Sequence, residues 1–463
     1  MTVHLKKSIP TATVPITVVD RRSLKALALR LPAATRRWLE TVGFTGAADS
    51  HALMPDGDGK LAQVFAGVAH ADHPFALAAL PLALPEGSYA LSEQGLKLPS
   101  EQAALSWTLG GYEFDRYKPR RRAPAQLVLE NTPQAQRGLA LAQAIATTRD
   151  LVNTPAEHMG PVELAEAAKA MAKPHGAKFR QTVGDALLKA NFPAIHAVGR
   201  ASARAPRLIE LSWGKPKHPL LCIVGKGVCF DSGGLDIKGA ESMRQMKKDM
   251  GGAANALGLA ALVMGMKLPL RLQVLIPAVE NSISGNAYRP GDVFKTRKGI
   301  QIEIGNTDAE GRVILCDALA YASESKPELI IDMATLTGAA RVALGPQLPA
   351  LFSKRLDVAR QLVDLSMQLE DPMWHMPLWA PYKAGIESNI GDIVNTGRNT
   401  MAGAINAALF LEYFVPKEQD WLHIDLFAWN DAARAGRPIG GEAQTIRTLL
   451  VYLEQRFSKA SPT

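Results

Sequence analysis

Charged residues that directly follow apolar runs are the chemically informative feature of this sequence of 463 residues. One such segment follows the apolar run 220–224 and reads GKGVCFDSGG over residues 225–234, so Lys226 and Asp231 stand among glycines and apolar residues. An isolated buried charge is very costly, so buried charges are paired or bound to a metal. Taken alone, this segment is explained equally well by a glycine-rich turn that holds one buried Lys–Asp ion pair.

A second charged segment, GNTDAEGR over residues 305–312, also follows a short apolar run and also precedes a predicted helix. Asp308 and Glu310 are two residues apart, and alternate side chains of an extended chain share a face, so both carboxylates can point to one place. A single Asp-x-Glu is often only a helix cap followed by a solvated glutamate. Two acidic segments of this kind in one domain make that simpler explanation much weaker.

Together these segments supply a set of acidic groups that would repel one another if they met in one site. Crowded carboxylates shift their pKa values unless cations neutralise them, and divalent metals are the usual solution. Two metals about 3.5 to 4 Å apart can polarise a carbonyl and activate a water. The sequence therefore predicts hydrolysis of an acyl or phosphoryl bond. The acidic candidates are Asp231, Asp249, Asp308 and Glu310, with Lys226 and Lys238 nearby and Arg312 just beyond them.

Other catalytic machinery is missing from the sequence, which contains no H-E-x-x-H, no G-x-S-x-G and no G-x-x-x-x-G-K-[ST] motif. Zincin, serine hydrolase and phosphate-loop chemistry therefore lose support. Ser232 has no triad spacing around it, so a role in the turn is the better interpretation. Cys222 and Cys229 have apolar neighbours, which favours packing over reactivity. The isolated histidines, such as His158, are interpreted as structural.

The elements that would position these residues alternate between strands and helices. Apolar runs at 220–224, 270–278, 300–304, 329–333 and 423–428 predict strands, and residues 241–266 and 313–323 predict helices. This alternation predicts an α/β domain with a mainly parallel sheet flanked by helices, whose ligands bind at the carboxyl ends of the strands. We expect a smaller N-terminal α/β domain over 1–132, a linker helix over 133–150 and a catalytic domain over 151–463.

Composition limits the remaining possibilities. The net charge of +8 and the basic run 118–122 permit weak attraction to nucleic acid, but such runs are more often solvated loops, so nucleic-acid binding is unlikely. The three cysteines have no C-x-x-C spacing and fit a reducing compartment. No apolar run approaches the roughly 20 residues that span a bilayer. We therefore expect a cytoplasmic protein without a membrane segment.

The second half of the chain resembles the leucyl aminopeptidase family, the two-metal cytosol aminopeptidases. The matching blocks are NTDAEGR at 306–312, VGKG at 224–227 with FDSGG at 230–234, KDMGGAA at 248–254 and MATLTGA at 333–339. The resemblance covers residues 145–463 well and the N-terminal part only weakly, through FDRYK at 114–118. It implies a metal-dependent aminopeptidase that hydrolyses the N-terminal bond of peptides and aminoacyl amides.

The resemblance also implies a role for each matching residue. One metal would be held by Lys226, Asp231, Asp249 and Glu310, and the second by Asp231, Asp308 and Glu310 with help from the Asp308 carbonyl. Lys226 can ligate only when neutral, and burial is expected to lower its pKa. Lys238 would stay charged and polarise the scissile carbonyl, and Arg312 would hold a bicarbonate that acts as general base. The substrate pocket would contain Met246, Asn306, Thr335, Leu336 and Gly338.

The same resemblance implies two divalent ions per subunit, and Mn²⁺, Zn²⁺ and Mg²⁺ all suit these ligands. It also implies a homohexamer of about 300 kDa, six times 49.8 kDa. One departure stands out, because many family members have a small residue where this chain has Asp236. If Asp236 pairs with Lys238, it weakens the field of Lys238 on the substrate. A two-metal phosphoesterase remains the alternative enzyme, and a DNA-binding or scaffolding role remains the non-enzymatic alternative.

Overall fold

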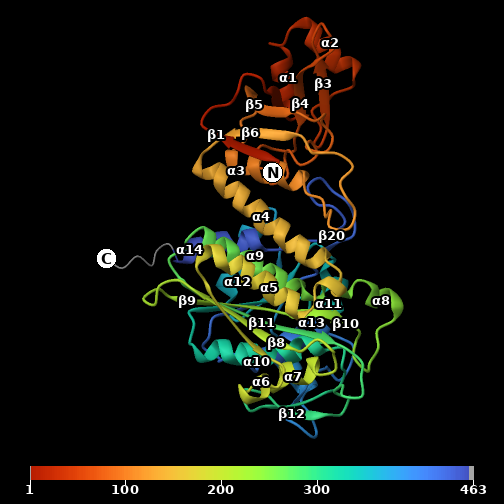
Figure 1. The fold of residues 1–463 in the computed structure, drawn as a ribbon, viewed down its shortest axis with the longest axis vertical. Helices are drawn as coiled ribbons and strands as arrows, with labels where there is room; N and C mark the ends of the chain where they lie inside the picture. Colours follow the sequence, from red (N-terminus) through yellow and green to blue (C-terminus); the bar gives the residue numbers. More distant parts are fainter. Residues whose placement is uncertain (1, 458–463) are drawn as a thin grey trace. The chain divides into compact units, whose positions relative to one another are not determined.

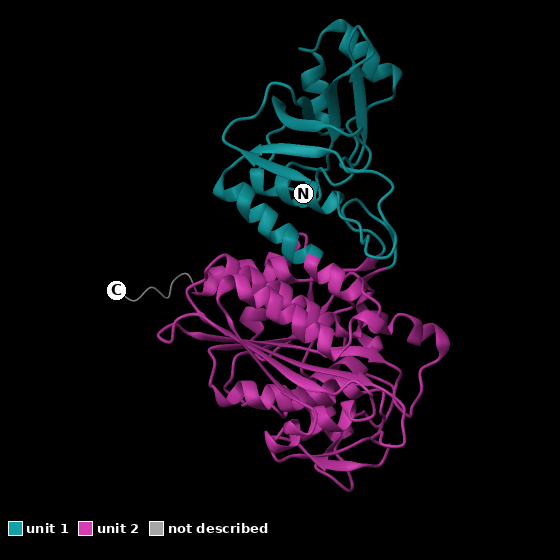
Figure 2. Ribbon diagram, in the orientation of Figure 1, with its two compact units in different colours: residues 1–146, 431–439 teal, residues 147–430, 440–463 magenta. Residues whose placement is uncertain are grey.

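The computed structural model describes residues 2–457, which form two compact units (Figure 2). The first unit contains residues 1–146 with 431–439, and the second contains residues 147–430 with 440–463. Helix α4 (Pro133–Asn153) begins in the first unit and ends in the second. All the charged segments singled out above lie in the second unit.

The first unit is built on a six-stranded sheet with the order β1-β6-β5-β2-β4-β3. Its strands pair in parallel except for β3, which runs antiparallel to β4. Val18 and Trp107 belong to its buried core. The strands are β1 (Val3–Lys6), β2 (Val14–Val19), β3 (His51–Pro55), β4 (Leu61–Gly67), β5 (Ser88–Gly95) and β6 (Gln126–Glu130), and the helices are α1 (Arg21–Ala28), α2 (Ala33–Thr41) and α3 (Ser100–Gly110).

The second unit is built on a nine-stranded mixed sheet with the order β16-β15-β18-β14-β9-β11-β8-β7, in which β10 also pairs with β11. Its centre, β18-β14-β9-β11, is entirely parallel, while β15, β8 and β7 add antiparallel pairs toward the edges. The strands are β7 (Lys178–Val183), β8 (Arg207–Trp213), β9 (Leu220–Gly225), β10 (Gly227–Asp231), β11 (Arg271–Asn281), β14 (Leu329–Ala334), β15 (Ala350–Ser353), β16 (Trp374–His375) and β18 (Trp421–Asp425).

Helices cover both faces of this sheet: α5, α9, α12 and α14 lie on one face, and α6, α7 and α10 on the other (Figure 1). A sheet covered on both faces needs apolar side chains on both, and every residue of β14 is buried accordingly. The helices are α5 (Pro161–Ala172), α6 (Ala186–Lys189), α7 (Pro193–Gly199), α8 (Ala240–Arg244), α9 (Gly251–Gly265), α10 (Glu310–Glu324), α11 (Gly338–Leu344), α12 (Leu356–Gln368), α13 (Gly403–Glu412) and α14 (Ile446–Phe457).

Short elements complete the second unit. Two small sheets are formed by β12 (Val293–Lys295), β13 (Gln301–Glu303) and β17 (Ile393–Val394), and by β19 (Trp429–Asn430) and β20 (Gly440–Gly441). The 3-10 turns are η1 (Ala156–His158), η2 (Lys173–His175), η3 (Met246–Met250) and η4 (Ala380–Ile386). None of the helices in the described part of the chain is long and apolar enough to cross a membrane.

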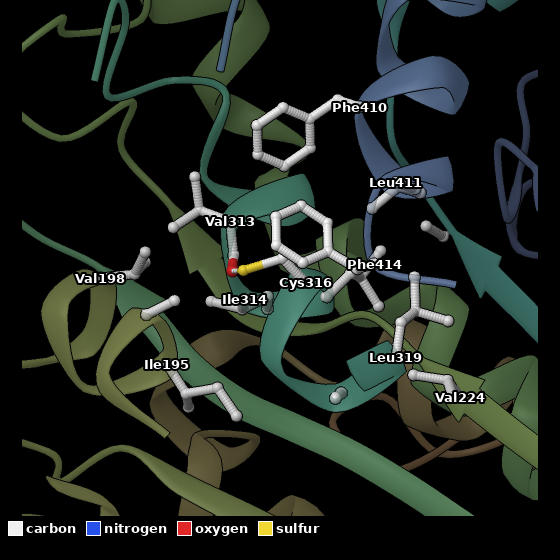
Figure 3. Packing of buried hydrophobic residues seen from close by; sticks show 14 of the residues in the cluster. Ile195, Val198, Val224, Val313, Ile314, Cys316, Leu319, Phe410, Leu411 and Phe414 are labelled. Atoms are coloured by element: carbon white, nitrogen blue, oxygen red, sulfur yellow. Dashed lines mark hydrogen bonds between the residues drawn. The ribbon is translucent and has the colours of Figure 1, made fainter. Parts of the chain in front are cut away.

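The core on the α10 side of the sheet contains apolar side chains from segments far apart in the sequence. Val224 of β9, Val313 and Cys316 of α10, and Phe410 and Phe414 of the α13 region belong to one buried cluster (Figure 3). The Cys316 thiol donates to the Val313 carbonyl oxygen, and all three cysteines are buried and free. This packing fixes the first turn of α10, which begins at one of the acidic candidates.

The predicted α/β fold class, with a small N-terminal domain and a mainly parallel catalytic sheet, is confirmed. The predicted helix 241–266 is wrong in detail, because the chain divides there into α8, η3 and α9. A Cβ on Gly252 would lie 2.2 Å from the Met333 carbonyl oxygen, so the chain passes tightly against β14 at this point. The resulting break places η3 and its acidic residue beside the strand ends.

Candidate metal centre and substrate pocket

Four carboxylates lie together at the carboxyl ends of the central strands. Asp231 ends β10, Asp249 lies in η3, Asp308 lies in the loop after β13, and Glu310 is the first residue of α10. Oxygen atoms of Asp231, Asp308 and Glu310 lie within 4.8 Å of one another. The predicted start of α10, near 313, was three residues too late; the earlier start puts Glu310 at the positive end of the helix dipole.

Lys226 reaches this cluster because it lies in the break between strands β9 and β10. β9 and β10 both pair with β11, and Lys226 stands between them, donating its backbone N–H to the Met333 carbonyl. Its Nζ lies 2.8 Å from Asp249 Oδ2 and 2.9 Å from Glu310 Oε1. A Cβ on Gly311 would lie 2.6 Å from Lys226 Cε, so a larger residue at position 311 would force the lysine side chain to move.

Lys238 contacts the other two carboxylates. Its Nζ lies 2.9 Å from Asp231 Oδ2 and 2.5 Å from Asp308 Oδ1. Asn281, at the end of β11, donates from Nδ2 to Asp231 Oδ1 and to the Thr307 carbonyl, so it ties the β10 end to the 305–309 loop. The structure therefore brings together all four acidic candidates and both lysines.

The donor set fits divalent cations. Four carboxylates share two ammonium groups, so the two lysines can neutralise at most two of the four negative charges. Asp249 Oδ2, Asp308 Oδ1 and Glu310 Oε1 are buried and accept no hydrogen bond within the described residues, although each contacts a lysine Nζ. Buried carboxylate oxygens with spare lone pairs are the ligands that hard divalent metals prefer.

The electrostatics of the cluster reflect the same crowding. Burial and the neighbouring Asp249 raise the pKa of Asp231 to about 6. Burial and Asp231 raise the pKa of Glu310 well above its ordinary value. Burial opposes the charge on Asp249, but Lys226 and Lys248 outweigh it and lower its pKa. A cation that replaces the protons would relieve the repulsion among these groups.

The expected effect of burial on Lys226 is present, but it does not decide the pKa of this lysine. Burial does oppose its charge, but the attraction of Asp249, Glu310 and Asp231 is larger and raises the pKa above the ordinary lysine value. Lys238 behaves in the same way, because Asp231 and Asp308 outweigh its burial and raise its pKa. Lys226 therefore gives up its proton only in exchange for a competing metal cation.

Arg312 is the third residue of α10 and is buried beside the cluster. Its Nη1 donates to the Asn395 carbonyl at 2.8 Å, while its Nε has no partner among the described residues. Burial lowers its pKa to about 10, so it is charged at neutral pH. Asn395 was not predicted from the sequence, because nothing in its local sequence marks it. Its Oδ1 accepts from the backbone N–H groups of Gly305 and Asn306.

The cluster opens into a cavity of about 250 Å³. Met246, Thr335, Leu336 and Gly338, predicted for the substrate pocket, line this cavity together with the charged residues. Asn306 does not belong to the described lining; its Oδ1 accepts from the backbone N–H of Asp308 at 2.6 Å and so shapes the acidic loop.

Asp425, at the end of β18, holds the 335–338 part of the pocket wall and was missed from the sequence. Its Oδ1 accepts from the backbone N–H groups of Leu336 and Thr337, and its Oδ2 accepts from the Thr337 hydroxyl at 2.6 Å. The signal that could have found it is its position at the end of a strand that runs parallel to β14.

Asp236 does not pair with Lys238. Its Oδ2 accepts from the backbone N–H of Thr307 at 2.8 Å and lies 3.1 Å from the Thr307 hydroxyl, which also accepts from the Asp236 backbone N–H. Asp236 therefore fastens the 305–309 loop to the segment that carries Lys238. The suggested weakening of Lys238 by a direct ion pair has no basis in this geometry.

Two further cations, which the sequence analysis did not assign, line the same cavity. Lys248 is almost completely buried and its Nζ lies 4.7 Å from the centre of the Phe427 ring. The Arg341 guanidinium carbon lies 4.9 Å from the same ring centre, and its Nη1 donates to the Thr337 carbonyl. Burial and the nearby Arg341 lower the pKa of Lys248 to about 7.

Comparisons with known proteins agree with this geometry. Residues 146–450 match the model of the cytosol aminopeptidase family catalytic domain, and residues 14–130 match the M17 aminopeptidase N-terminal domain. The probable cytosol aminopeptidase of Syntrophotalea carbinolica is 40% identical over 388 residues, 79% of this chain and 78% of that protein. The corresponding protein of Aquifex aeolicus is 40% identical over 357 residues, 74% of this chain and 72% of the other.

Solved structures show the same likeness. The cytosol aminopeptidase of Coxiella burnetii is 46% identical and superposes with a TM-score of 0.94 over 98% of this chain and 99% of that one. The bottromycin maturation enzyme BotP in complex with Mn is 32% identical, with a TM-score of 0.86 over 96% of this chain and 100% of the other.

Proposed function

The chain belongs to the cytosol aminopeptidase family and is a metal-dependent aminopeptidase, and from this we propose how its own residues share the work of hydrolysis. The family decides between the two enzyme classes that the sequence left open, in favour of the peptide bond over the phosphate ester. The observation that carries the proposal is the meeting of four carboxylates and two lysines beside one cavity.

We propose that the cluster holds two divalent metals. Lys226, Asp231, Asp249 and Glu310 would hold one, and Asp231, Asp308 and Glu310, with the Asp308 carbonyl, would hold the other. Mn²⁺ is our first choice because BotP, a structural relative, was solved in complex with Mn, and Zn²⁺ and Mg²⁺ remain compatible with the same ligands. When bound, such a pair polarises the scissile carbonyl and lowers the pKa of a water.

The residues around the cluster would orient and stabilise the substrate. Lys238, charged and partly exposed to the cavity, would donate to the scissile carbonyl oxygen as negative charge develops there. The cavity wall, Thr335 to Gly338, would hold the first residue of the peptide, and Asp425 would keep that wall in place.

Arg312 would hold the general base. The side chains that could act as a base are committed: the carboxylates to ligation and Lys238 to its positive charge. An anion such as bicarbonate suits a guanidinium near the first turn of α10, because the planar fork of arginine matches two oxyanion oxygens. Its unpartnered Nε supports this role.

The proposal is tested first on the metal ligands. Asp308→Asn and Glu310→Gln should each abolish hydrolysis of leucine p-nitroanilide, while thermal melting changes little and metal content falls. Near-normal activity after loss of the metal would refute the metal-centre assignment. N-terminal acetylation of a peptide substrate should also stop cleavage, and equal turnover of blocked and free peptides would show an endopeptidase instead.

We further propose a cytoplasmic location, supported by the names of the relatives and by the free, buried cysteines. The proposal also includes a homohexamer. Large apolar side chains that are exposed in the single chain support an interface on the second unit, and they include Trp374, Trp379, Ile390 and Met401.

A further inference from the structure

The two cations beside Phe427 differ from the lysines of the metal centre in having no acidic partner. Lys226 and Lys238 each contact two carboxylates. Neither Lys248 nor Arg341 forms an ion pair with any residue that the structure describes, and both lie against the ring of Phe427. A buried amine without a paired carboxylate is costly to charge, so a substrate carboxylate beside Lys248 would supply the partner that this side chain lacks.

The position of this pair relates it to the substrate. Both side chains line the cavity that contains the acidic cluster. Arg341 Nη2 lies 3.6 Å from where a Cβ on Gly338 would be, so the guanidinium lies against the cavity wall held by Asp425. Lys248 directly precedes Asp249 in the sequence and comes two residues after Met246, which also lines the cavity.

The hydrogen-bonding capacity of the pair remains largely unused. Arg341 donates one N–H to the Thr337 carbonyl, and Lys248 Nζ donates no hydrogen bond to any residue that the structure describes. An arginine fork and a lysine ammonium together can donate several charge-assisted hydrogen bonds to one carboxylate. Phe427 supplies a cation–π contact that holds both groups without neutralising them.

We propose that Lys248 and Arg341 form a subsite for a carboxylate of the substrate. This subsite rests on the proposed aminopeptidase function and extends it to acidic or very short peptides. The carboxylate has two possible sources: the side chain of an N-terminal Glu or Asp, or the C-terminus of a dipeptide. Both would present the same chemistry to the pair.

The test measures kcat/KM for two matched substrate pairs in the metal-loaded enzyme. Glutamyl p-nitroanilide against glutaminyl p-nitroanilide isolates a side-chain carboxylate, and Leu-Gly against leucyl-glycinamide isolates a C-terminal carboxylate. Lys248→Met and Arg341→Met should each lower one of these two ratios by about 10- to 100-fold, the value expected for a lost hydrogen bond to a charged group. The affected ratio identifies the source.

The matched control is Lys247→Met. Lys247 is the neighbouring lysine, but its Nζ donates to the Asn153 carbonyl and it does not belong to the described cavity lining. This variant should keep both ratios of the parent. Metal content is measured on every sample. Loss of metal would lower kcat/KM for all four substrates together, whereas loss of the subsite would lower it only for the substrates with a carboxylate.

Two results would overturn the proposal. If both ratios stay within about twofold of the parent in Lys248→Met and Arg341→Met, the pair does not contact a substrate carboxylate. If Lys247→Met lowers the same ratio as much, the effect is one of general charge. If the parent enzyme releases leucine from leucyl-glycinamide while the variants give either of these results, the subsite is refuted and the aminopeptidase function stands.

Discussion

Arg312 illustrates at the level of single residues how a side chain can belong to the centre without being a metal ligand. Arg312→Ala should lower turnover by on the order of 100-fold, which is typical for the loss of a positioned general base. Both metals should stay bound, and added bicarbonate should stimulate the parent and not the variant. Turnover with and without bicarbonate, together with metal analysis, checks this.

A simpler role for Arg312 is to balance the charges of Asp308 and Glu310. In that case the variant would lose metal in proportion to activity, or would respond to bicarbonate as the parent does. Arg312→Lys is the useful control, because it keeps the charge and removes the fork that matches two oxygens. Full activity in Arg312→Lys would show that the positive charge alone is sufficient.

Asp236 is expected to act on the centre through Thr307. Removing its carboxylate in Asp236→Ala leaves the backbone N–H of Thr307, next to Asp308, without its acceptor, while the Thr307 hydroxyl keeps the Gly233 carbonyl. Groups that orient a metal ligand are typically worth 10- to 100-fold in metal affinity, so we expect a loss of that order. Metal titration of the purified protein measures it. Asp236→Asn keeps one acceptor oxygen and should recover most of the affinity; an unchanged affinity in Asp236→Ala would contradict this role.

The structure brings together the charged residues that the sequence singled out, whereas the residues that support them were missed. Asp308 and Glu310 have a spacing that places both carboxylates on one side of the chain, so local sequence was sufficient. Asp425 and Asn395 act through hydrogen bonds to loops more than 80 residues away in the chain. No local pattern records such a contact, because it exists only after the sheet has formed. The net rise of the Lys226 pKa was missed for the same reason, since the carboxylates that cause it come from other segments.

At the level of elements, α7 depends on a cap from another helix. The residue before α7, Phe192, offers no side-chain cap, and Asp317 of α10 supplies it: Oδ2 accepts from the Ala194 and Ile195 backbone N–H groups, and Oδ1 accepts from that of Arg297. A buried carboxylate thus fastens α7 and the 296–299 turn to α10.

Asp317→Asn should therefore destabilise the protein by about 1 to 3 kcal/mol, because the amide presents one acceptor oxygen to donors on both sides and leaves a buried N–H group unsatisfied. Urea denaturation would measure the change. The neighbouring exposed Glu324→Gln serves as a comparison and should cost less than about 1 kcal/mol, as expected for a surface pair. Equal effects at the two positions would contradict the capping role.

The elements themselves were predictable where periodicity was strong. β9, β11 and β14 occupy the predicted runs within a few residues, whereas β18 begins two residues before and ends three residues before the predicted run 423–428. The break between α8, η3 and α9 could not be predicted, because the helical pattern continues through Gly251 and Gly252. Both glycines lie against segments distant in the sequence, Gly251 against Ala428 and Gly252 against Met333 of β14, and local sequence does not record these contacts.

At the level of the whole molecule, the proposed hexamer is a measurable property. Static light scattering should give about 300 kDa, six times the chain mass of 49.8 kDa. Trp379 is 55% exposed in the single chain, and Trp379→Glu should lower the measured mass if this side chain lies in an interface. A fully active parent of about 50 kDa would refute the hexamer.

The position of β14 in the sheet has a consequence for the timing of activity during synthesis. β14 pairs with β9, about 100 residues earlier in the chain, and with β18, about 90 residues later. Such distant pairings form slowly and only after the later strand has been made. Asp425 ends β18, so the pocket wall it holds cannot be complete on a chain that stops short of it. We therefore expect a growing chain to carry all of its proposed metal ligands, the last at 310, for more than 100 residues of synthesis before it can cleave a peptide.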